Sequence, residues 1–454
     1  MSFTITQNLF CDDPTVITVV KCDDDALNMR HLQPLLDAKD RILGVAATYG
    51  KQCQLSSIAF STLSRVLVVN VPARHIPQPR GDAKQQQVAK SRGLIQDHLL
   101  INPKFQKHAF KMDQFATALH LDLSIRVNDA VDMLSVAVGS GRESLEALMN
   151  TMGGETQLYK ANVLSLFFGT SKSPAADAAA GVALQAWAAC RAATLPHMSS
   201  RFESLPRIDT LTFTNTRLNA LANIFRNADR LDAMKPTVVK NDVRDFTVKK
   251  GAINLVCARF PTRIKQSKTQ AIQIEFKDKE ATSRVVGRAR DVRGRSAHIS
   301  VNGPVQGDKI VSVTTIGKDD PTCAEATRQN VILEALQYKA NIFSNPFFQS
   351  LWLPEEWPVW PRSKGQGREI PVHFPYDPNV SQRAAVQKIL SDKDDDRIVM
   401  VQGPPGTGKT TVIAASVVSH CHANSGQAIW VTAQSNVAVK NIAEKFTKVG
   451  FYKF

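Results

Sequence analysis

The stretch that decides the fold of the C-terminal region is RIVMVQGPPGTGKTT, Arg397–Thr411. A short apolar segment, Ile398–Val401, leads into the pattern Gly-x-x-x-x-Gly-Lys-Thr, and residues with helical spacing follow. The apolar segment is predicted to be a buried strand. The glycines allow successive backbone amides to curl round a phosphate at the start of the next helix. A chance glycine-rich turn is the weaker alternative, because a strand is predicted before the loop and a helix after it.

This phosphate-binding loop predicts ATP and Mg²⁺ as cofactors. The Lys409 ammonium group is expected to reach the β- and γ-phosphates, and the Thr410 hydroxyl is expected to ligate the Mg²⁺ ion. The loop residues predicted to bind ATP are Gly403, Pro404, Pro405, Gly406, Thr407, Gly408, Lys409, Thr410 and Thr411. Thr410 is the one metal ligand that the pattern identifies.

Two further segments flank the loop. NVSQRAAVQKIL, Asn379–Leu390, precedes it, and there Asn379 and Gln382 fit a capping box at the start of a helix. AIWVTAQSNVAV, Ala428–Val439, follows it and is predicted to be a second strand that ends in a polar loop and enters a helix.

Together these segments resemble a superfamily 1 helicase of the Upf-like group. The resemblance implies a RecA-like domain in which Gln382 reads adenine and in which Ser435 and Asn436 contact the nucleic-acid backbone. It covers roughly residues 217 to 454 and is specific in its motifs only from about residue 377 onward.

The chain departs from that family after the loop. ATP hydrolysis requires an acidic motif to hold Mg²⁺ and polarise water, together with arginines that stabilise the transition state. After Lys409 the sequence contains one carboxylate, Glu444, and no arginine, and it stops at Phe454 before a strand that could bear the acidic motif. No catalytic residue is predicted, and whether the chain is an enzyme stays open.

Two hypotheses follow from this departure. The chain is either the N-terminal portion of an ATP-dependent RNA or DNA helicase, truncated and inactive alone, or a non-catalytic nucleic-acid-binding or regulatory module that keeps a nucleotide-binding loop.

Positive charge is concentrated upstream of the loop. The formal net charge is +15, and residues 231–310 hold 17 basic against 8 acidic side chains. Such a segment favours a polyanionic partner, here single-stranded RNA or DNA, although a solvated basic surface is the alternative. The nucleic-acid site is predicted at five arginines, with the first three on one face of a strand and the last two at a turn. They are Arg284, Arg288, Arg290, Arg293 and Arg295.

Short apolar runs at regular spacing between residues 252 and 316 predict a small β-barrel. A helix is expected before it at Arg217–Leu231, and another after it, where Thr322 and Glu325 form a capping box. This region resembles the barrel that Upf-like helicases carry beside their first motor domain.

The N-terminal region predicts a mixed sheet covered by helices. Strands are expected at Arg41–Ala47, Gln52–Phe60 and Val66–Val71, a loop at Pro72–Gln87, and helices at Asp113–Leu121, Glu143–Met152 and Ala175–Ala193.

This N-terminal region weakly resembles a ribonuclease-H-like 3′–5′ exonuclease. The resemblance places Ala46 and Thr48 where the first acidic pair belongs, Asp113 and Asp132 at later acids, and Gly181 at the last. Two carboxylates do not hold two metal ions, so we expect no Mg²⁺- or Mn²⁺-dependent nuclease activity. An unrelated α/β domain is the alternative.

The predicted fold class is a multidomain α/β protein. Its parts are an exonuclease-like domain over 1–215, a helical stalk with the basic barrel over 216–345, a Pro- and Trp-rich connector over 346–376 and an incomplete P-loop domain over 377–454. Seven scattered cysteines without a C-x-x-C pair argue against disulfides and zinc. The longest apolar stretches are interrupted by charges, so no membrane span is predicted. The cysteine pattern suits a reducing compartment and the N-terminus shows no secretory signal, so the sequence predicts an intracellular protein, nuclear or cytoplasmic.

Overall fold

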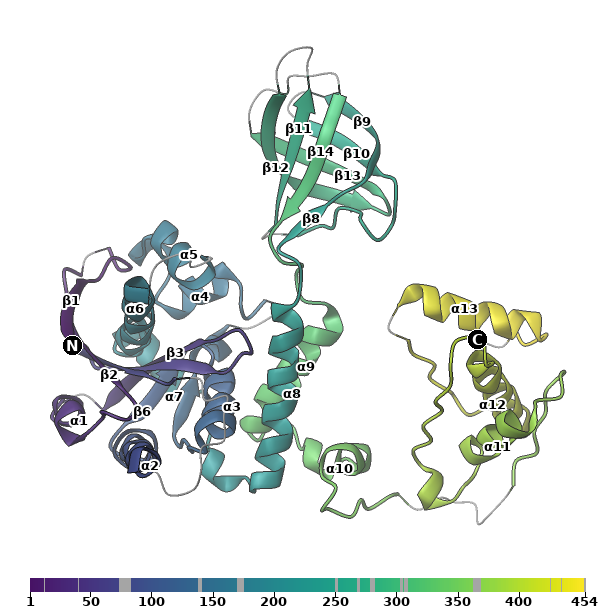
Figure 1. Ribbon diagram of the computed structural model, residues 1–454, viewed down its shortest axis with the longest axis horizontal. Helices are drawn as coiled ribbons and strands as arrows, with labels where there is room; N and C mark the ends of the chain where they lie inside the picture. Colours follow the sequence, from purple (N-terminus) through teal and green to yellow (C-terminus); the bar gives the residue numbers. More distant parts are fainter. Residues whose placement is uncertain are drawn as a thin grey trace. The chain divides into compact units, whose positions relative to one another are not determined.

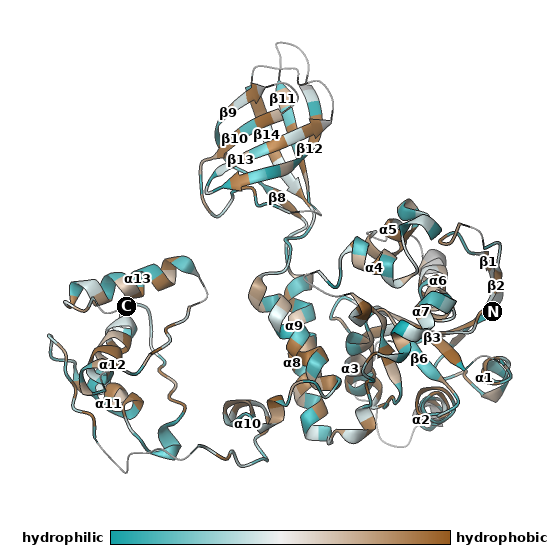
Figure 2. Ribbon diagram, turned by 180° about the vertical axis from the view of Figure 1, so that it is seen from behind, coloured by the Kyte–Doolittle hydropathy of each residue, from teal (hydrophilic) through white to brown (hydrophobic). Residues whose placement is uncertain are grey.

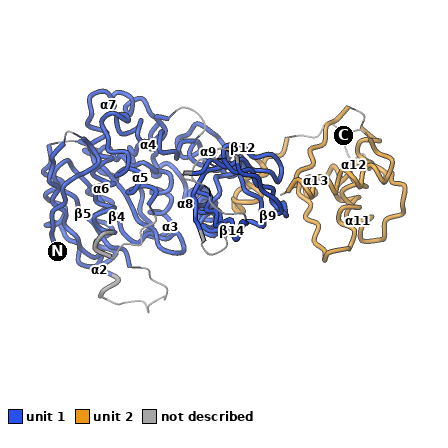
Figure 3. Tube along the Cα trace, turned by 90° about the horizontal axis from the view of Figure 1, so that it is seen from above, with its two compact units in different colours: residues 1–341 blue, residues 342–454 orange. Residues whose placement is uncertain are grey.

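The computed structural model describes residues 1–452 except 12, 40, 73–82, 138–140, 170–174, 250–251, 268–269, 278–281, 303–304, 306–308, 362–368, 425 and 434. The chain forms two compact units, Met1–Asn341 and Ile342–Phe454 (Figure 3). Within the described residues, no helix is long and apolar enough to cross a bilayer.

The first unit begins with a seven-stranded mixed sheet in the order β1-β2-β5-β4-β3-β6-β7. The strands are β1 (Ser2–Thr6), β2 (Val16–Asp23), β3 (Ile42–Tyr49), β4 (Leu55–Ser61), β5 (Arg65–Asn70), β6 (Gln106–Ala109) and β7 (Ala130–Asp132). Strand β4 is antiparallel to both of its neighbours, whereas β3, β6 and β7 run parallel. The predicted strands β3, β4 and β5 are confirmed. The β1–β2 hairpin and the short strands β6 and β7 were not predicted.

Helices cover both faces of this sheet (Figure 1). The helices are α1 (Met29–Leu36), α2 (Ala83–Ile95), α3 (Met112–Leu123), α4 (Leu145–Thr151), α5 (Lys160–Phe168), α6 (Ala175–Ala193) and α7 (Pro196–Glu203). Strand β5 shows why both faces are covered: Val66 and Val68 belong to the apolar cluster under α6, while Leu67 and Val69 are equally buried on the other face. The three predicted helices are confirmed. The predicted loop 72–87 lies largely outside the described residues, and α2 already begins within it, at Ala83.

Helix α6 lies unusually close to β3. A Cβ atom on Gly44 would stand 2.0 Å from the Ala186 carbonyl oxygen and 2.8 Å from Cys190 Cβ. The facing side of α6 carries small buried side chains, among them Ala183 and Ala186, which allow the helix to approach. Glycine at position 44 is therefore required by the packing of the helix on the sheet.

The second sheet of this unit is antiparallel, in the order β8-β14-β11-β12-β13-β10-β9. The strands are β8 (Val238–Lys240), β9 (Val243–Lys249), β10 (Ala252–Cys257), β11 (Ala271–Lys277), β12 (Thr282–Arg293), β13 (Ser296–Asn302) and β14 (Lys309–Ile316). Strands β8 and β9 occupy opposite ends of the order, yet only Asn241 and Asp242 separate them in the chain, so the sheet curls into a half-barrel, called the barrel below (Figure 1). Apolar and polar residues alternate along its strands (Figure 2).

Two helices flank the barrel, as predicted: α8 (Asn215–Ala233) and α9 (Cys323–Leu336). The capping box at the start of α9 is confirmed, with the Thr322 side chain accepting from the Glu325 amide. The Lys235 ammonium lies 3.0 Å from Glu325 Oε2 and thereby ties the end of α8 to the start of α9. Helix α8 also packs on α3.

The second unit is built from helices α10 (Pro346–Trp352), α11 (Val380–Ile389), α12 (Lys409–Ala423) and α13 (Asn436–Lys448). The strand predicted at 398–401 and the one predicted to begin the segment 428–439 are wrong: no strand is present among the described residues of this unit. A strand forms only against a partner, and Met400 and Trp430 are 89% and 90% exposed. The apolar cluster of this unit instead joins α11 to α12 through Val386, Leu390, Val412 and Ala415.

We expect Gly44→Ala to lower the stability of the N-terminal domain. The new methyl group must displace the α6 backbone, and overpacking of this kind costs about 1–3 kcal/mol. Calorimetry should show the transition of this domain at a lower temperature. Gly93→Ala in α2 is the matched control, because a Cβ there meets nothing within 4 Å. An unchanged transition for Gly44→Ala would contradict the packing described.

Candidate functional site

The phosphate-binding loop is held in a turn that requires its glycines. Gly406 and Gly408 adopt φ values of +83° and +84°, the left-handed region that favours glycine. Thr407 Oγ1 donates to the Pro404 carbonyl oxygen at 2.9 Å, and a Cβ on Gly403 would lie 2.7 Å from that hydroxyl. The backbone of the loop is therefore set by local contacts.

The loop ends at the N-terminus of α12. The N-cap of α12 is Gly408, and no side chain hydrogen-bonds to the first turn of this 15-residue helix. The backbone amides at its N-terminus can therefore donate hydrogen bonds to an anion. The Lys409 ammonium donates to the carbonyl oxygens of Gly403 and Pro404, at 2.6 and 2.7 Å. A phosphate, as a charged acceptor, is a stronger partner than either carbonyl. Together with the Thr410 hydroxyl on the first turn, these groups fit a nucleotide phosphate with Mg²⁺.

The structure brings Gln382 to the same loop. The predicted capping box is present, since Gln382 Oε1 accepts from the Asn379 amide at 3.2 Å and Asn379 Oδ1 accepts from the Gln382 amide at 2.9 Å. The other end of the Gln382 side chain, Nε2, donates to the Thr407 carbonyl oxygen at 3.0 Å. One residue thus caps α11 and contacts the loop, and the assignment of Gln382 as adenine reader stays a prediction.

Ser435 and Asn436 lie at the start of α13. Ser435 is its N-cap, and its Oγ accepts from the Ala438 amide at 3.2 Å. Both residues are exposed. Further along the same helix, Lys440 Nζ lies 3.5 Å from Glu444 Oε1, so the carboxylate that follows the loop is paired within its own helix.

The first three arginines of the predicted nucleic-acid site lie on β12, and the prediction that alternation places all three on one face fails at Arg290, where a bulge interrupts the strand. Arg284, Arg288 and Arg290 are exposed, whereas Val285 is buried in the barrel core. A β-bulge that the sequence did not reveal shifts the register between Ala289 and Asp291.

The two arginines at the predicted turn are also exposed. Arg293 Nε lies 3.1 Å from Asp291 Oδ2, an exposed ion pair of the kind that contributes little to stability. The side chain of Arg295 donates to the Ala258 carbonyl oxygen at 3.0 Å.

In the N-terminal domain, Asp113 and Asp132 come together at an arginine that the sequence did not single out. Arg142 Nη1 donates to Asp113 Oδ2 at 2.9 Å, and its Nη2 donates to Asp113 Oδ1 at 3.0 Å and to Asp132 Oδ1 at 2.6 Å. Both carboxylate side chains are fully buried. Thr48, at one of the other predicted positions, hydrogen-bonds through Oγ1 to the hydroxyls of Ser56 and Ser57.

The electrostatics of this cluster follow from its burial. Burial by itself would raise the pKa of Asp113, but the guanidinium of Arg142 holds that pKa below its ordinary value. Burial, with the nearby charge of Asp113, raises the pKa of Asp132. The pKa of Arg142 is raised by the two carboxylates despite its own burial. The arginine is thus the counter-ion of both acids, and no group of three or more His, Cys, Asp or Glu in the described part of the chain could hold a metal ion.

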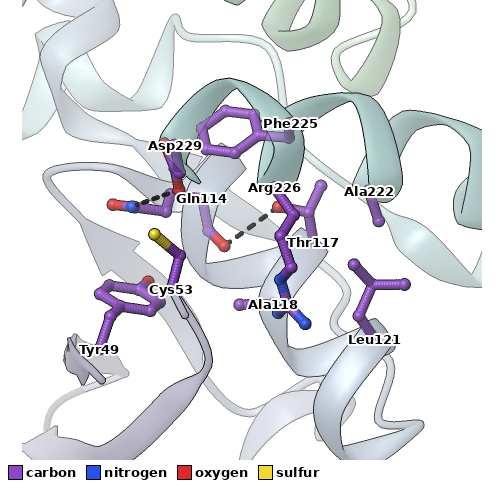
Figure 4. Close-up of a pocket in the computed structure, with 10 residues that line it drawn as sticks. All are labelled: Tyr49, Cys53, Gln114, Thr117, Ala118, Leu121, Ala222, Phe225, Arg226 and Asp229. Atoms are coloured by element: carbon purple, nitrogen blue, oxygen red, sulfur yellow. Dashed lines mark hydrogen bonds between the residues drawn. The ribbon is translucent and has the colours of Figure 1, made fainter. Parts of the chain in front are cut away.

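A small cavity lies beside this cluster, between β3, α3 and α8 (Figure 4). Gln114 Nε2 donates to Asp229 Oδ2 at 2.8 Å across it, and burial raises the pKa of Asp229 to about 6 despite this hydrogen bond. Its volume of about 10 Å³ is at the lower limit for one water molecule, so the cavity does not accommodate a substrate.

The C-terminal segment is similar to known proteins. Residues 377–453 match the AAA domain family. Over 72 residues the chain is 40% identical to a regulator of nonsense transcripts 1 homolog of Neurospora crassa, and over 78 residues it is 44% identical to the ATP-dependent helicase upf1 of Schizosaccharomyces pombe. Over 82 residues it is 39% identical to an uncharacterized ATP-dependent helicase of Methanocaldococcus jannaschii.

These matches cover 16–18% of this chain and 6–12% of those three relatives. The similarity supports the resemblance to Upf-like superfamily 1 helicases for the AAA-matching segment, which includes Gln382, the phosphate-binding loop and Ser435. The barrel and the N-terminal sheet lie outside the matched residues.

We expect Arg142→Met to destabilise the N-terminal domain by about 3–5 kcal/mol, because two buried carboxylates lose their counter-ion. The loss should be smaller at pH 5 than at pH 7. Without the arginine, burial raises the pKa of both carboxyl groups in the folded variant. At a pH between the folded and unfolded pKa values, the folded variant holds protons that the unfolded chain has released. Its stability therefore falls as the pH rises. Denaturant unfolding at the two pH values measures this.

Two further variants complete the test of this cluster. Arg201→Met, at an exposed arginine on α7, should change little. Combining Arg142→Met with Asp113→Asn and Asp132→Asn removes the charges together and should restore much of the stability. An equal loss at both pH values would show that charge is not the cause.

Proposed function

We propose that this chain supplies the nucleotide-binding and nucleic-acid-binding parts of an ATP-dependent helicase. The phosphate-binding loop carries the proposal, because its left-handed glycines, the uncapped N-terminus of α12 and Lys409 converge on one point. The similarity of residues 377–453 to ATP-dependent helicases supports it.

In this proposal Lys409 contacts the β- and γ-phosphates and Thr410 ligates Mg²⁺. Gln382, already hydrogen-bonded to the loop at the Thr407 carbonyl oxygen, lies at one side of the nucleotide and reads its adenine. Ser435 and Asn436 present an exposed helix N-terminus to the nucleic-acid backbone.

A second candidate is a module that binds nucleotide without hydrolysing it. Glu444 favours this alternative, because its carboxylate pairs with Lys440 on its own helix α13. Hydrolysis requires a carboxylate beside the Mg²⁺ ion.

For the N-terminal domain we infer a ribonuclease-H-like scaffold without a metal centre. The order β5-β4-β3-β6-β7, in which β4 alone is antiparallel, supports the scaffold. Arg142, placed between Asp113 and Asp132, supports the loss of metal binding, because a fixed guanidinium neutralises the acids that a cation would otherwise bridge.

We expect Lys409→Ala to weaken binding of a fluorescent ATP analogue by about tenfold or more, because one charged hydrogen-bond partner contributes about 1.5–3 kcal/mol. Lys440→Ala, which removes an exposed lysine from α13, is the control and should bind like the wild type. Equal affinities for Lys409→Ala and the wild type would place the nucleotide elsewhere.

The same titration is paired with an ATPase assay that separates the two candidates. For this chain alone we expect nucleotide binding without turnover above background. If the wild type hydrolyses ATP in the presence of Mg²⁺ and Lys409→Ala does not, the result favours the ATP-dependent helicase over the module that only binds nucleotide.

We expect the triple substitution Arg288→Ala, Arg290→Ala and Arg293→Ala to flatten the salt dependence of single-strand binding. Each phosphate contact that is lost lowers the slope of log affinity against log salt by about 0.7. Affinity measured by fluorescence anisotropy between 50 and about 200 mM salt checks this, and ATP-analogue binding should be unaffected. An unchanged slope would place the nucleic-acid surface away from β12.

A further inference from the structure

The loop between β10 and β11 presents an aromatic ring to solvent. Phe260 is 53% exposed, and the Arg263 guanidinium lies over its ring at 3.5 Å from the centroid. Arg263 Nη1 also donates to the Phe260 carbonyl oxygen at 3.1 Å. The arginine therefore fixes the ring and covers one of its faces, and the exposure of the ring leaves apolar surface available beyond the guanidinium.

The ring sits on a loop that is anchored to the barrel. Ile264 is 1% exposed and belongs to the barrel core. Asn241 Nδ2 donates to the Thr262 carbonyl oxygen at 3.0 Å, and the Ala258 amide donates to the Asp242 carbonyl oxygen at 2.7 Å. A preorganised ring loses little conformational entropy when a ligand packs on it.

The arginine-rich turn between β12 and β13 lies at the same end of the barrel. The Cys257 amide donates to the Arg295 carbonyl oxygen at 2.9 Å, and the Arg295 guanidinium donates to the Ala258 carbonyl oxygen at 3.0 Å. Gln266 Nε2 donates to the Arg290 carbonyl oxygen at 3.1 Å, which joins the bulge of β12 to the later part of the same loop.

The barrel end thus combines one exposed ring with a surplus of positive charge. Five arginines gather on these two segments: Arg259, Arg263, Arg290, Arg293 and Arg295. Among the described residues, Asp242 lies 3.9 Å from Arg259 and Asp291 lies 3.1 Å from Arg293, while Asp319 and Asp320 contact Lys265 and Ser267 later in the same loop. Arginines therefore outnumber carboxylates, and the Arg259 and Arg293 side chains are 77% and 87% exposed.

We propose that Phe260 is a stacking platform for a base of single-stranded nucleic acid, with the surrounding arginines on the phosphates. This inference rests on the proposed nucleic-acid-binding function and adds a substrate class to it. An unpaired base has a free face that stacks on an aromatic ring or a guanidinium plane, whereas in a duplex both faces are covered. Such stacking is tolerant of base identity, so the site selects single strands over duplexes.

The chemistry of the surface favours a nucleic acid over a protein partner. Protein interfaces are centred on contiguous apolar surface with few charges in the middle. Here an exposed ring lies against the guanidinium of Arg263, and four more arginines stand on the same two segments. Single-strand-binding proteins combine aromatic rings with basic side chains in this way. Composition did not single out Phe260, because an exposed phenylalanine in a loop gives no periodic pattern.

The test measures binding of the whole chain to fluorescein-labelled oligo(U) and oligo(dT) of about 20 nucleotides by anisotropy, with a duplex of equal length alongside. Phe260→Ala should weaken single-strand affinity by about tenfold, leave the salt slope unchanged and leave duplex affinity unaltered. Phe260→Trp should retain affinity, and its added fluorescence should be quenched on binding. Phe260→Leu, which keeps apolar bulk without a π face, should lose affinity as the alanine variant does.

Val311→Ala is the matched control, because Val311 is also 53% exposed and lies on β14 of the same barrel. Thermal unfolding of Phe260→Ala, compared with the wild type, checks that the barrel is folded. Wild-type affinity in Phe260→Ala, or retained affinity in Phe260→Leu, overturns the stacking role. If Phe260→Ala binds like the wild type but the triple substitution Arg288→Ala, Arg290→Ala and Arg293→Ala flattens the salt slope, this inference fails and the proposed function stands. If the wild type binds neither oligonucleotide, both fail.

Discussion

The buried guanidinium of Arg142 is the interaction on which the N-terminal domain depends. Two fully buried carboxylates lie against it, and neither ionises at acceptable cost in a low-dielectric interior without a cation. The arginine ties the start of α3 to the end of β7, because Asp113 is the second residue of α3 and Asp132 the last of β7. Asp132 also accepts from the Met112 amide at 3.0 Å, so the same carboxylate holds the helix to the sheet. The two carboxylates and the arginine thereby join the helix to the sheet.

The barrel uses arginines in the opposite way. There the guanidiniums stand on an exposed strand and an exposed turn, and their ion pairs, such as Arg293 with Asp291, leave a net positive surface. Screening makes such pairs weak in water, so they are readily exchanged for phosphates. The buried Arg142 stabilises the fold of its domain. The exposed arginines near the Phe260 ring remain available for phosphate groups of a polyanion.

The sequence predicted elements whose causes are local and missed those whose causes are distant. Alternation along β12 up to its bulge and the capping boxes of α9 and α11 depend on neighbouring residues, and all three are present. The strand β8 pairs with β14, and Arg142 pairs with Asp113 from 29 residues earlier, so both depend on partners that no local pattern encodes. The predicted strands before and after the phosphate-binding loop failed for the same reason, because strand pairing is a property of neighbours.

The conformation of the phosphate-binding loop depends on contacts within the loop and with two neighbouring helices. Without a paired strand before it, the loop still has its left-handed glycines, the Thr407–Pro404 hydrogen bond and the bridge from Gln382. Helices α11 and α12 support it through a shared apolar cluster. Phosphate binding requires only these groups, since backbone amides and one lysine supply the attraction. Hydrolysis requires a carboxylate that the fold must carry to the metal from another strand, and Glu444 pairs instead with Lys440 on its own helix. Binding and turnover therefore depend on different levels of structure, and the groups that we propose for phosphate binding all lie within residues 379 to 412.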